Sequence, residues 1–294
     1  MTTIMPDAIA ESGTKAGAVS IEDDGSRGRP ARVRRLEARY GPWAVVTGAS
    51  DGIGREFALR LARSGLHLVL AARRGEALAR LGAELATRHG VQTLAVAVDL
   101  STPGGVAELV RRTSQLEVGL LVAAAGFGTS GRFIDGDLSA ELEMIDLNCR
   151  AVAALSHHFG ARFAKQGRGG MVLMSSLVAF QGVARAANYA ATKAYVQSLA
   201  EALRLELGPS GVDVVSSAPG PIESGFAKRA GMNMGLALAP DAVAQETLDA
   251  LGRRGTVRPG WLSKLLELSL AFLPRRARVR MMSVVMGRMT TPGG

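Results

Sequence analysis

Cysteine, aromatic residues and long apolar runs are all scarce in this sequence, and each shortage excludes a class of protein. The single cysteine, Cys149, excludes an internal disulfide and is consistent with a reducing compartment. Aromatic residues make up 4% of the chain and do not alternate with its arginines, so a surface for stacking nucleic-acid bases is not expected. Residues 1–25 lack the apolar run of a secretory signal, and we expect a cytoplasmic protein.

Acidic residues are too few at the two ends of the chain to balance the arginines there. Residues 26–40 carry six Arg and one Glu, and residues 253–288 carry eight Arg, one Lys and one Glu. The formal net charge of +9 therefore resides in the ends, and this distribution favours solvated basic tails over a nucleic-acid partner. Residues 1–39 also lack periodic apolar positions and are predicted to be a disordered N-terminal tail.

Metal ligands are not gathered in the sequence. His157 and His158 are adjacent on a predicted helix, where neighbouring side chains point in different directions, and no carboxylate or cysteine completes a tetrahedral set. We predict no metal site.

Glycine, in contrast, is abundant, and three glycines follow the first predicted strand. Residues 43–47 are a short apolar run typical of a buried strand, and Gly48, Gly52 and Gly54 precede apolar positions at helical spacing. A loop without side chains lets backbone N–H groups and the positive end of the following helix approach a phosphate. The alternative for this stretch alone is a glycine-rich turn between two core elements.

Strand and helix patterns alternate along residues 40–258, which we predict to be one nucleotide-binding and catalytic domain. Strands separated by helices of this length form parallel βαβ units. We therefore predict an α/β fold, a doubly wound Rossmann-type parallel sheet of about seven strands with helices on both faces. Further strands are expected at 66–72, 92–98, 119–124, 170–174 and 212–217, and helices at 75–88, 104–115, 139–158 and 188–207.

Polar residues stand at the carboxyl ends of these strands, the edge at which such sheets bind ligands. Arg73 and Arg74 follow the second strand, where an arginine can pair with the 2′-phosphate of a dinucleotide; a solvated surface pair is the alternative. Asp99 ends the third strand, either as a ligand contact or as a helix cap. A second glycine-rich loop, residues 125–131, follows the fourth strand.

A tyrosine and a lysine lie four residues apart in the predicted helix 188–207. This spacing places Tyr189 and Lys193 on one helix face, and a neighbouring cation favours the phenolate, which makes the tyrosine a better proton donor and acceptor near neutral pH. Ser176 follows the fifth strand. Asn148 lies on an apolar helix face, either as a buried structural hydrogen-bonding group or as part of a polar site.

The whole set resembles the short-chain dehydrogenase/reductase family over about residues 41–258. After the sixth strand, residues 219–224 are similar to the Pro-Gly motif that lies beside the nicotinamide in this family. The other residues that carry the resemblance, in this order and at these intervals, are Thr47 with the three glycines, Asp99, Asn148, Ser176, Tyr189 and Lys193.

The resemblance implies a role for each matching residue. Tyr189 would be the general acid or base, Lys193 would lower its pKa and hold the nicotinamide ribose, Ser176 would orient the substrate oxygen, and Asn148 would position a water in a proton relay. The implied catalytic residues are Asn148, Ser176, Tyr189 and Lys193. The implied cofactor-binding residues are Gly48, Ser50, Asp51, Gly52, Ile53, Gly54, Arg73, Arg74, Asp99, Leu100, Ala125, Gly126, Tyr189, Lys193, Pro219, Gly220, Ile222 and Ser224.

The resemblance also implies a cofactor. An arginine placed like Arg73, with Ala72 instead of an acid before it, implies that NADP(H) is preferred over NAD(H). The sequence departs from the family where Ala123 and Ala124 replace the usual pair of asparagines, because a side-chain amide that ties the sheet to the cofactor ribose is then missing.

Two further segments are expected around this core. Residues 225–240 combine Met, Leu and Ala with Gly, which predicts a mobile lid over an apolar substrate or, alternatively, an ordinary core-covering helix. Residues 259–294 are predicted to be an apolar and basic helical extension, in which a helix over 261–273 would span roughly 20 Å and would not cross a bilayer of ~30 Å. Packing on the domain, on a partner subunit or on a membrane surface stays open.

These observations predict an NADP(H)-dependent oxidoreductase that interconverts a carbonyl and an alcohol on an apolar small molecule, as a homodimer or homotetramer. The alternative is a cofactor-binding but catalytically idle adaptor that acts at a membrane or a protein partner through its basic tails.

Overall fold

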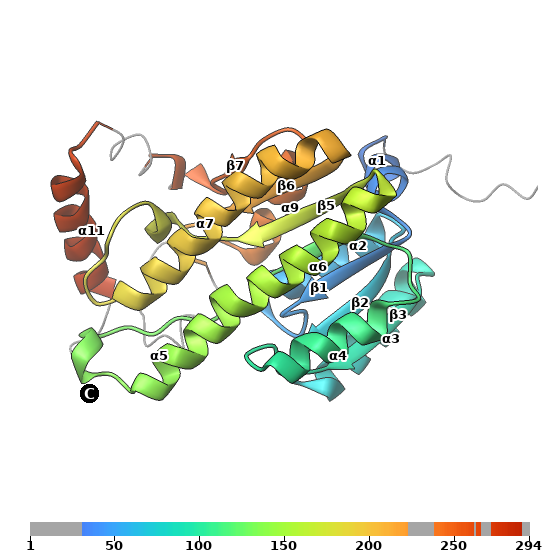
Figure 1. The fold of residues 1–294 in the computed structure, drawn as a ribbon, viewed down its shortest axis with the longest axis horizontal. Coiled ribbons are helices and arrows are strands. Elements are labelled where there is room, and N and C mark those ends of the chain that lie inside the picture. Colours follow the sequence, from blue (N-terminus) through green and yellow to red (C-terminus); the bar gives the residue numbers. More distant parts are fainter. Residues whose placement is uncertain (1–30, 223–237, 262, 266–271, 290–294) are drawn as a thin grey trace, which may run out of the picture.

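A single parallel sheet organises the computed structural model, which describes residues 31–222, 238–261, 263–265 and 272–289. Its strand order is β3-β2-β1-β4-β5-β6-β7, and every neighbouring pair is parallel, which confirms the predicted doubly wound sheet (Figure 1). The strands are β1 Trp43–Thr47, β2 His67–Ala72, β3 Thr93–Ala97, β4 Val118–Ala123, β5 Gly169–Met174, β6 Val212–Ser217 and β7 Thr256–Val257.

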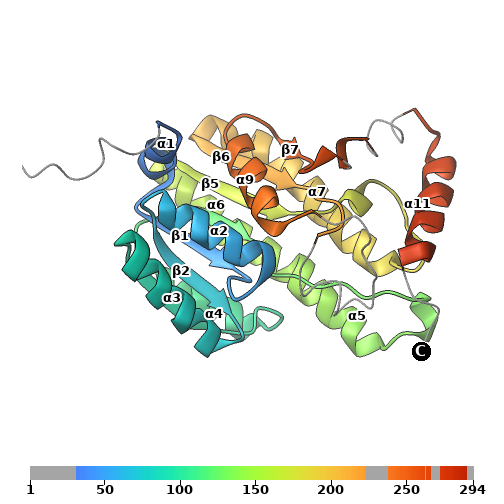
Figure 2. The ribbon, with the colours of Figure 1, turned by 180° about the vertical axis from the view of Figure 1, so that it is seen from behind.

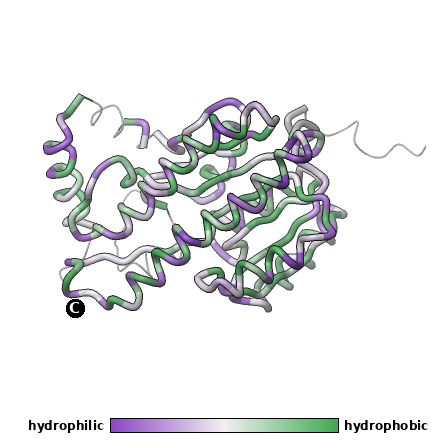
Figure 3. The backbone as a smooth tube through the Cα atoms, viewed as in Figure 1, coloured by the Kyte–Doolittle hydropathy of each residue, from purple (hydrophilic) through white to green (hydrophobic). Residues whose placement is uncertain are grey.

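Alternate residues of the strands face opposite layers of helices. Ala44 and Val46 of β1 belong to one buried cluster, whereas Val45 between them belongs to another, because successive side chains of a strand point to opposite faces. Both faces are buried, so the sheet lies in the apolar centre of the hydropathy-coloured tube (Figure 3). One face is covered by α4 Pro103–Thr113, α6 Ala151–Gln166 and α7 Ala187–Leu207 (Figure 1), and the other by α2 Gly52–Arg63, α3 Gly75–His89 and α9 Pro240–Ala250 (Figure 2).

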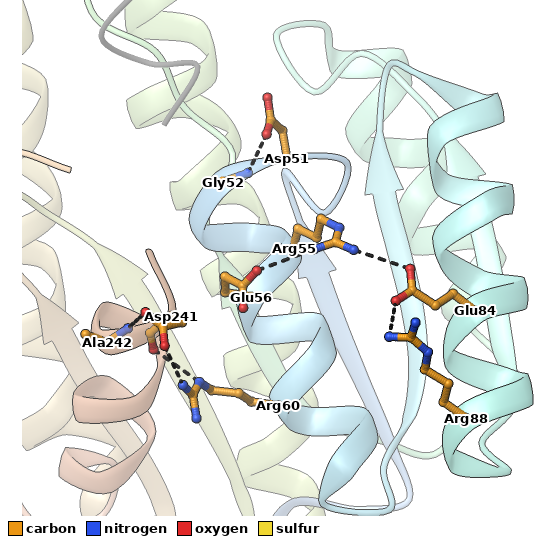
Figure 4. A network of polar contacts seen from close by, with 9 residues as sticks. All are labelled: Asp51, Gly52, Arg55, Glu56, Arg60, Glu84, Arg88, Asp241 and Ala242. Atoms are coloured by element: carbon orange, nitrogen blue, oxygen red, sulfur yellow. Dashed lines mark hydrogen bonds and ion pairs between the residues drawn. The ribbon is translucent and has the colours of Figure 1, made fainter. Parts of the chain in front are cut away.

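Ion pairs hold the helix that follows the glycine loop to both of its neighbours. Arg55 of α2 pairs with Glu84 of α3 at 3.3 Å, and Arg60 pairs with the Asp241 carboxylate of α9 at 3.5 Å (Figure 4). Arg60 also donates from Nε to the Asp241 backbone oxygen at 3.1 Å. Exposed ion pairs of this kind contribute little stability each, about 0–1 kcal/mol. The buried residues of α2, Phe57, Leu61 and Ala62 among them, hold the helix against the sheet.

The prediction of a disordered tail up to residue 39 is wrong for its last part, because helix α1 covers Ala31–Tyr40. Leu36 and Tyr40, one turn apart, are buried, and the Tyr40 hydroxyl donates to Asp213 of β6 at 2.6 Å. Arg39 also pairs with this carboxylate, at 2.5 Å. The helix is therefore stabilised by contacts with a strand far along the chain. Residues 1–30 lie outside the described residues.

The helix predicted at 139–158 is longer and has an irregular middle. It runs as α5 Leu138–Ile145, a π-helical turn η2 at Asp146–Arg150, and α6. Single π turns inside helices are rare and often occur at functional sites. Short 3-10 helices occur before α5, between β5 and α7 and between α7 and β6, as η1 Phe133–Asp135, η3 Leu177–Phe180 and η4 Gly208–Ser210.

The C-terminal extension contains helix α11 Arg275–Met289, which lies across one end of the molecule (Figures 1 and 2). Most of the predicted lid, 225–237, and much of the predicted helix 261–273 lie outside the described residues; Pro240 begins α9. Among the helices that the structure describes, none combines the length and the apolar character needed to cross a bilayer.

Candidate active site

In the loop between β1 and α2, Gly48 and Gly54 lie where the backbone of another residue approaches closely. Gly48 has a φ of +68°, and a Cβ at this position would lie 3.0 Å from the backbone nitrogen of Ala125. A Cβ on Gly54 would overlap the Gly48 carbonyl oxygen. Asp51 accepts a hydrogen bond from the Gly52 N–H at 2.7 Å and begins α2. The loop therefore forms a cradle without side chains at a helix N-terminus, the arrangement that favours a phosphate.

A cavity of about 420 Å³ opens at this cradle, where the strand order reverses between β1 and β4. Parallel sheets bind ligands at such a switch point, and the volume lies in the range of small-molecule sites. All predicted cofactor-binding residues from the first four strands line it, namely Gly48, Ser50, Asp51, Gly52, Ile53, Gly54, Arg73, Arg74, Asp99, Leu100, Ala125 and Gly126.

The two arginines after β2 differ in what they contact. Arg74 donates to the backbone oxygen of Ser50 at 3.1 Å and to its hydroxyl at 3.2 Å, and it pairs with Asp51 at 3.4 Å. Arg73 reaches Glu143 at 3.4 Å, with about half of its side chain exposed. Arg74 thus braces the glycine loop, whereas Arg73 forms an exposed pair that a stronger anion could replace.

Asp99 lies in the turn between β3 and α4, but the cap of α4 is Thr102, whose side chain accepts from the Gly105 N–H. The Asp99 carboxylate accepts hydrogen bonds from the N–H and the hydroxyl of Ser101, at 2.9 and 2.7 Å, so it shapes the turn into α4. Asp99 and Leu100 both line the cavity as well.

The four predicted catalytic residues come from three elements, α7, η3 and η2, and meet beside the cavity. Tyr189 and Lys193 lie on α7, and the Lys193 Nζ is 5.7 Å from the centre of the Tyr189 ring. Ser176, at the start of η3, hydrogen-bonds to Tyr189. A Cβ on Gly126, which lines the cavity, would lie 2.9 Å from Asn148 Oδ1 and 3.5 Å from Lys193 Nζ.

Asn148 lies in the π turn and links two elements. Its Oδ1 accepts from the Phe127 N–H at 3.2 Å, and its Nδ2 donates to the Phe127 oxygen at 2.8 Å and to the Thr192 hydroxyl at 3.1 Å. The buried amide is therefore a structural hydrogen-bonding group that also lies in the polar site.

The Pro-Gly segment follows β6 next to the serine. The Pro219 oxygen accepts from the Leu177 N–H at 2.9 Å, and the Gly220 N–H donates to the Ser263 hydroxyl at 3.0 Å. Ile222 forms an isolated parallel bridge with Leu238. Ser224 lies outside the described residues.

Comparison with known proteins agrees with this geometry. A family model described as short chain dehydrogenase matches residues 42–234, more than half of the chain. The chain belongs to the short-chain dehydrogenase family. It has the Rossmann-type fold of this oxidoreductase family, whose members bind NAD(P).

Relatives of this dehydrogenase act on different molecules. The 7β-hydroxysteroid dehydrogenase of Collinsella aerofaciens is 28% identical over 78% of this chain and 90% of its own length. A very-long-chain 3-oxoacyl-CoA reductase of Meyerozyma guilliermondii is 30% identical over 82% of this chain and 76% of its own. A short-chain dehydrogenase from Sphingobium yanoikuyae, solved with NADPH, superposes with a TM-score of 0.71 at 29% identity and covers 86% of this chain and 98% of the other.

Thr47 links the sheet to the loop where this dehydrogenase lacks the usual asparagines. Its hydroxyl accepts from the Ala125 N–H at 3.0 Å and donates to the Val122 oxygen at 3.4 Å. One tie between β1 and the end of β4 is therefore present without an amide at Ala123 or Ala124.

Burial opposes the pKa change that spacing alone suggested for the tyrosine. Desolvation raises the pKa of Tyr189 to about 12, although its hydrogen bond with Ser176 acts in the opposite direction. Burial also lowers the pKa of Lys193 to about 8, and its ammonium donates to the Met174 oxygen at 2.9 Å. The expected lowering of the tyrosine pKa by a charged lysine is thus absent from this structure.

Sequence reasoning missed several residues of the dehydrogenase site. Thr192 bonds to Asn148, and three further apolar residues line the cavity, namely Val98, Phe127 and Leu147. Val98 directly precedes Asp99, and Phe127 directly follows Gly126, so adjacency to a motif was the available signal. No group of metal-binding side chains is present among the residues described.

Proposed function

We propose that the protein is an NADP(H)-dependent oxidoreductase that interconverts a ketone or aldehyde and an alcohol on an apolar small molecule. One observation carries the proposal: Tyr189, Ser176 and Lys193 gather next to the cavity that the glycine cradle opens. A proton donor, a second hydroxyl and a cation beside a dinucleotide site are the groups that carbonyl reduction requires.

In this mechanism Tyr189 donates the proton to the carbonyl oxygen during reduction and removes it during oxidation. Its raised pKa keeps the phenol protonated at neutral pH, which suits reduction. Ser176, bonded to the phenol, orients the same substrate oxygen. Lys193 adds positive charge below its pKa of about 8 and stabilises charge that develops on that oxygen. A bound nicotinamide supplies or accepts the hydride.

The cavity residues fit a dinucleotide, and the arginines favour the phosphorylated form. Gly48 and Gly54 occupy positions where a Cβ would come too close to neighbouring backbone atoms. The N-terminus of α2, which favours a phosphate, lies beside them. No carboxylate occupies the end of β2, where Ala72 stands before Arg73 and Arg74. The relative from Sphingobium yanoikuyae, which was solved with NADPH, supports the same preference.

An apolar substrate is supported by what surrounds the phenol. Tyr189 belongs to a buried cluster with Phe127, Met144 and Val178. The relatives named as steroid dehydrogenase and very-long-chain 3-oxoacyl-CoA reductase point to bulky or elongated molecules. Homo-oligomer formation, cytoplasmic location and contact of the basic extension with a membrane stay predictions, as does the idle adaptor.

Turnover separates the enzyme from the adaptor. NADPH oxidation is followed with steroid ketones, long-chain aliphatic ketones and 3-oxoacyl thioesters. We expect activity that Tyr189→Phe lowers at least 1,000-fold, in the upper part of the range for a lost general acid, while the Kd for NADPH stays within about twofold. Tyr195→Phe, on the same helix but 43% exposed, is the matched control and should retain activity. Equal activity of the two variants would refute the catalytic assignment.

A further inference from the structure

Ser263 lies outside the segment that the family model matches, and yet it contacts the Pro-Gly segment of the site. The match ends at residue 234. The Gly220 N–H donates to the Ser263 hydroxyl at 3.0 Å, and Ser263 is 3% exposed. A buried serine of the C-terminal extension is therefore bonded to the backbone that follows β6.

The contact is close because Gly220 has no side chain. A Cβ at this position would lie 2.8 Å from the Ser263 Oγ, nearer than carbon and oxygen atoms that are not bonded to each other normally approach. The serine hydroxyl therefore occupies the space that a side chain on Gly220 would need.

One carboxylate of α9 holds the chain on both sides of Ser263. Glu246 accepts a hydrogen bond from the Gly260 N–H at 3.1 Å, and its other oxygen pairs with the Lys264 ammonium at 2.9 Å. Gly260 has a φ of +84°, a turn conformation that glycine adopts readily. The position of the Ser263 hydroxyl is thus set by contacts with α9 as well as by its bond to Gly220.

The Pro-Gly segment lies at the end of the site that holds the proposed proton donor. The Pro219 oxygen accepts from the Leu177 N–H at 2.9 Å, and Leu177 follows Ser176, which bonds to Tyr189. The glycine cradle and the two arginines lie instead at the ends of β1 and β2. A hydride must reach the carbon whose oxygen Tyr189 protonates, so a nicotinamide ring belongs beside the Pro-Gly segment and the phosphates belong in the cradle.

We propose that Ser263 is a positioning residue for the nicotinamide half of the cofactor. This inference rests on the proposed function and adds a residue that acts through the Gly220 backbone rather than by touching the substrate. The serine hydroxyl gives the partly buried Gly220 N–H an acceptor, and an N–H that loses its acceptor carries a cost that a shift of the segment would relieve. Without this hydroxyl the backbone beside the ring is less well fixed, so ligands that carry the ring bind more weakly.

The test compares a whole dinucleotide with its adenosine half. Kd values for NADP⁺ and for adenosine 2′,5′-bisphosphate, which keeps the 2′-phosphate but lacks the nicotinamide, are measured by isothermal titration calorimetry. Ser263→Ala should raise the Kd for NADP⁺ at least about threefold, the order expected for one hydrogen bond, and leave that for the bisphosphate within about twofold. Ser263→Thr keeps the hydroxyl and should restore NADP⁺ binding. Equal changes for the two ligands in Ser263→Ala would overturn the proposal.

Ser64→Ala is the matched control, because it removes the same group from another buried serine. Ser64 is 5% exposed, and its hydroxyl donates to the Arg60 oxygen near the end of α2. This variant should leave both Kd values within about twofold of the wild type. A selective loss of NADP⁺ affinity as large as in Ser263→Ala would overturn the proposal, because the effect would then not depend on the bond to Gly220.

Binding is measured without turnover, so the inference and the proposed function can fail separately. A wild type that binds NADP⁺ but reduces no ketone would refute the proposed function, and a selective loss in Ser263→Ala would still support the role of Ser263. A wild type that binds no NADP⁺ would overturn both. If Ser263→Ala does not fold, Ser263→Cys exchanges the hydroxyl for a weak acceptor. A selective loss of NADP⁺ affinity in that variant would support the proposal, and unchanged affinity would overturn it.

Discussion

Removal of the Arg73 guanidinium is expected to weaken the binding of NADPH but not of NADH. Arg73 pairs with Glu143 at 3.4 Å, and the two side chains are 47% and 38% exposed, so releasing this pair costs about 0–1 kcal/mol. A charge-assisted hydrogen bond to a 2′-phosphate contributes about 1.5–3 kcal/mol. The net contribution is the gain less the cost of the released pair, about 0.5–3 kcal/mol. Arg73→Ala should therefore raise the Kd for NADPH roughly 2- to 150-fold, since 1.4 kcal/mol corresponds to about tenfold.

The assay is a fluorescence titration with each dinucleotide at fixed, low ionic strength, because salt screens an exposed charge. Arg74→Ala is the matched comparison. Arg74 already holds Ser50 and Asp51, so its removal should loosen the glycine loop and weaken NADPH and NADH alike. Glu143→Gln should tighten NADPH slightly, because it frees Arg73 from its present partner.

Equal weakening of NADPH and NADH binding by Arg73→Ala would refute the assignment of Arg73 to the 2′-phosphate. That result would mean that Arg73 acts on a part shared by both dinucleotides. Selective loss in Arg74→Ala instead would assign the 2′-phosphate to Arg74 and would require that arginine to leave the loop contacts seen here.

Three other outcomes follow from the structure. Gly54→Ala places a Cβ on the Gly48 oxygen, so we expect a loss of at least about tenfold in affinity for both dinucleotides, measured by the same titration. Lys193, with a pKa lowered to about 8, is charged below that pH and neutral above it; kcat/KM for NADPH should fall above about pH 8, and Lys193→Met should abolish this step in the pH profile. Tyr40→Phe removes the hydroxyl bond to Asp213 and should lower the free energy of unfolding by about 1–3 kcal/mol in urea titrations.

The sheet and the cradle were predictable because their signals are local. A valine-rich strand, glycines at fixed positions and a helical period lie within one stretch of sequence, and strand and helix patterns alternate after it. The two-residue strand β7 carries too short a pattern to have been given a range. Cavity lining followed from topology, since the carboxyl ends of parallel strands meet at one edge. The tie from Thr47 to Ala125 was not predictable, because it joins residues from two strands through a backbone N–H that carries no sequence signal.

Helix α1 shows why the remaining errors occurred. Its sequence carries four arginines in ten residues, and only Val33, Leu36 and Tyr40 offer larger apolar positions at helical spacing. Whether that weak face becomes a helix depends on Asp213, which lies far along the chain and anchors both Tyr40 and Arg39. Isolated helices of this length are marginal in water, so tertiary contacts decide the outcome. The burial of Met282 and Met286 of α11 was not predictable for the same reason, because it depends on contacts with residues far away in the sequence.

For Tyr189 and Lys193, helical spacing predicted that the side chains are close together but did not predict their protonation states. The i, i+4 spacing correctly predicted that Tyr189 and Lys193 lie near one another, but it assumed a charged lysine in a polar surrounding. Both groups are buried, and burial favours the neutral form of each, so it raises one pKa and lowers the other. Between about pH 8 and pH 12 both groups are neutral, so no cation faces the phenol in that range. Negative charge that lies close to the Lys193 ammonium and farther from the phenol would raise the pKa of that lysine and restore its charge, and the restored cation would then favour the phenolate of Tyr189.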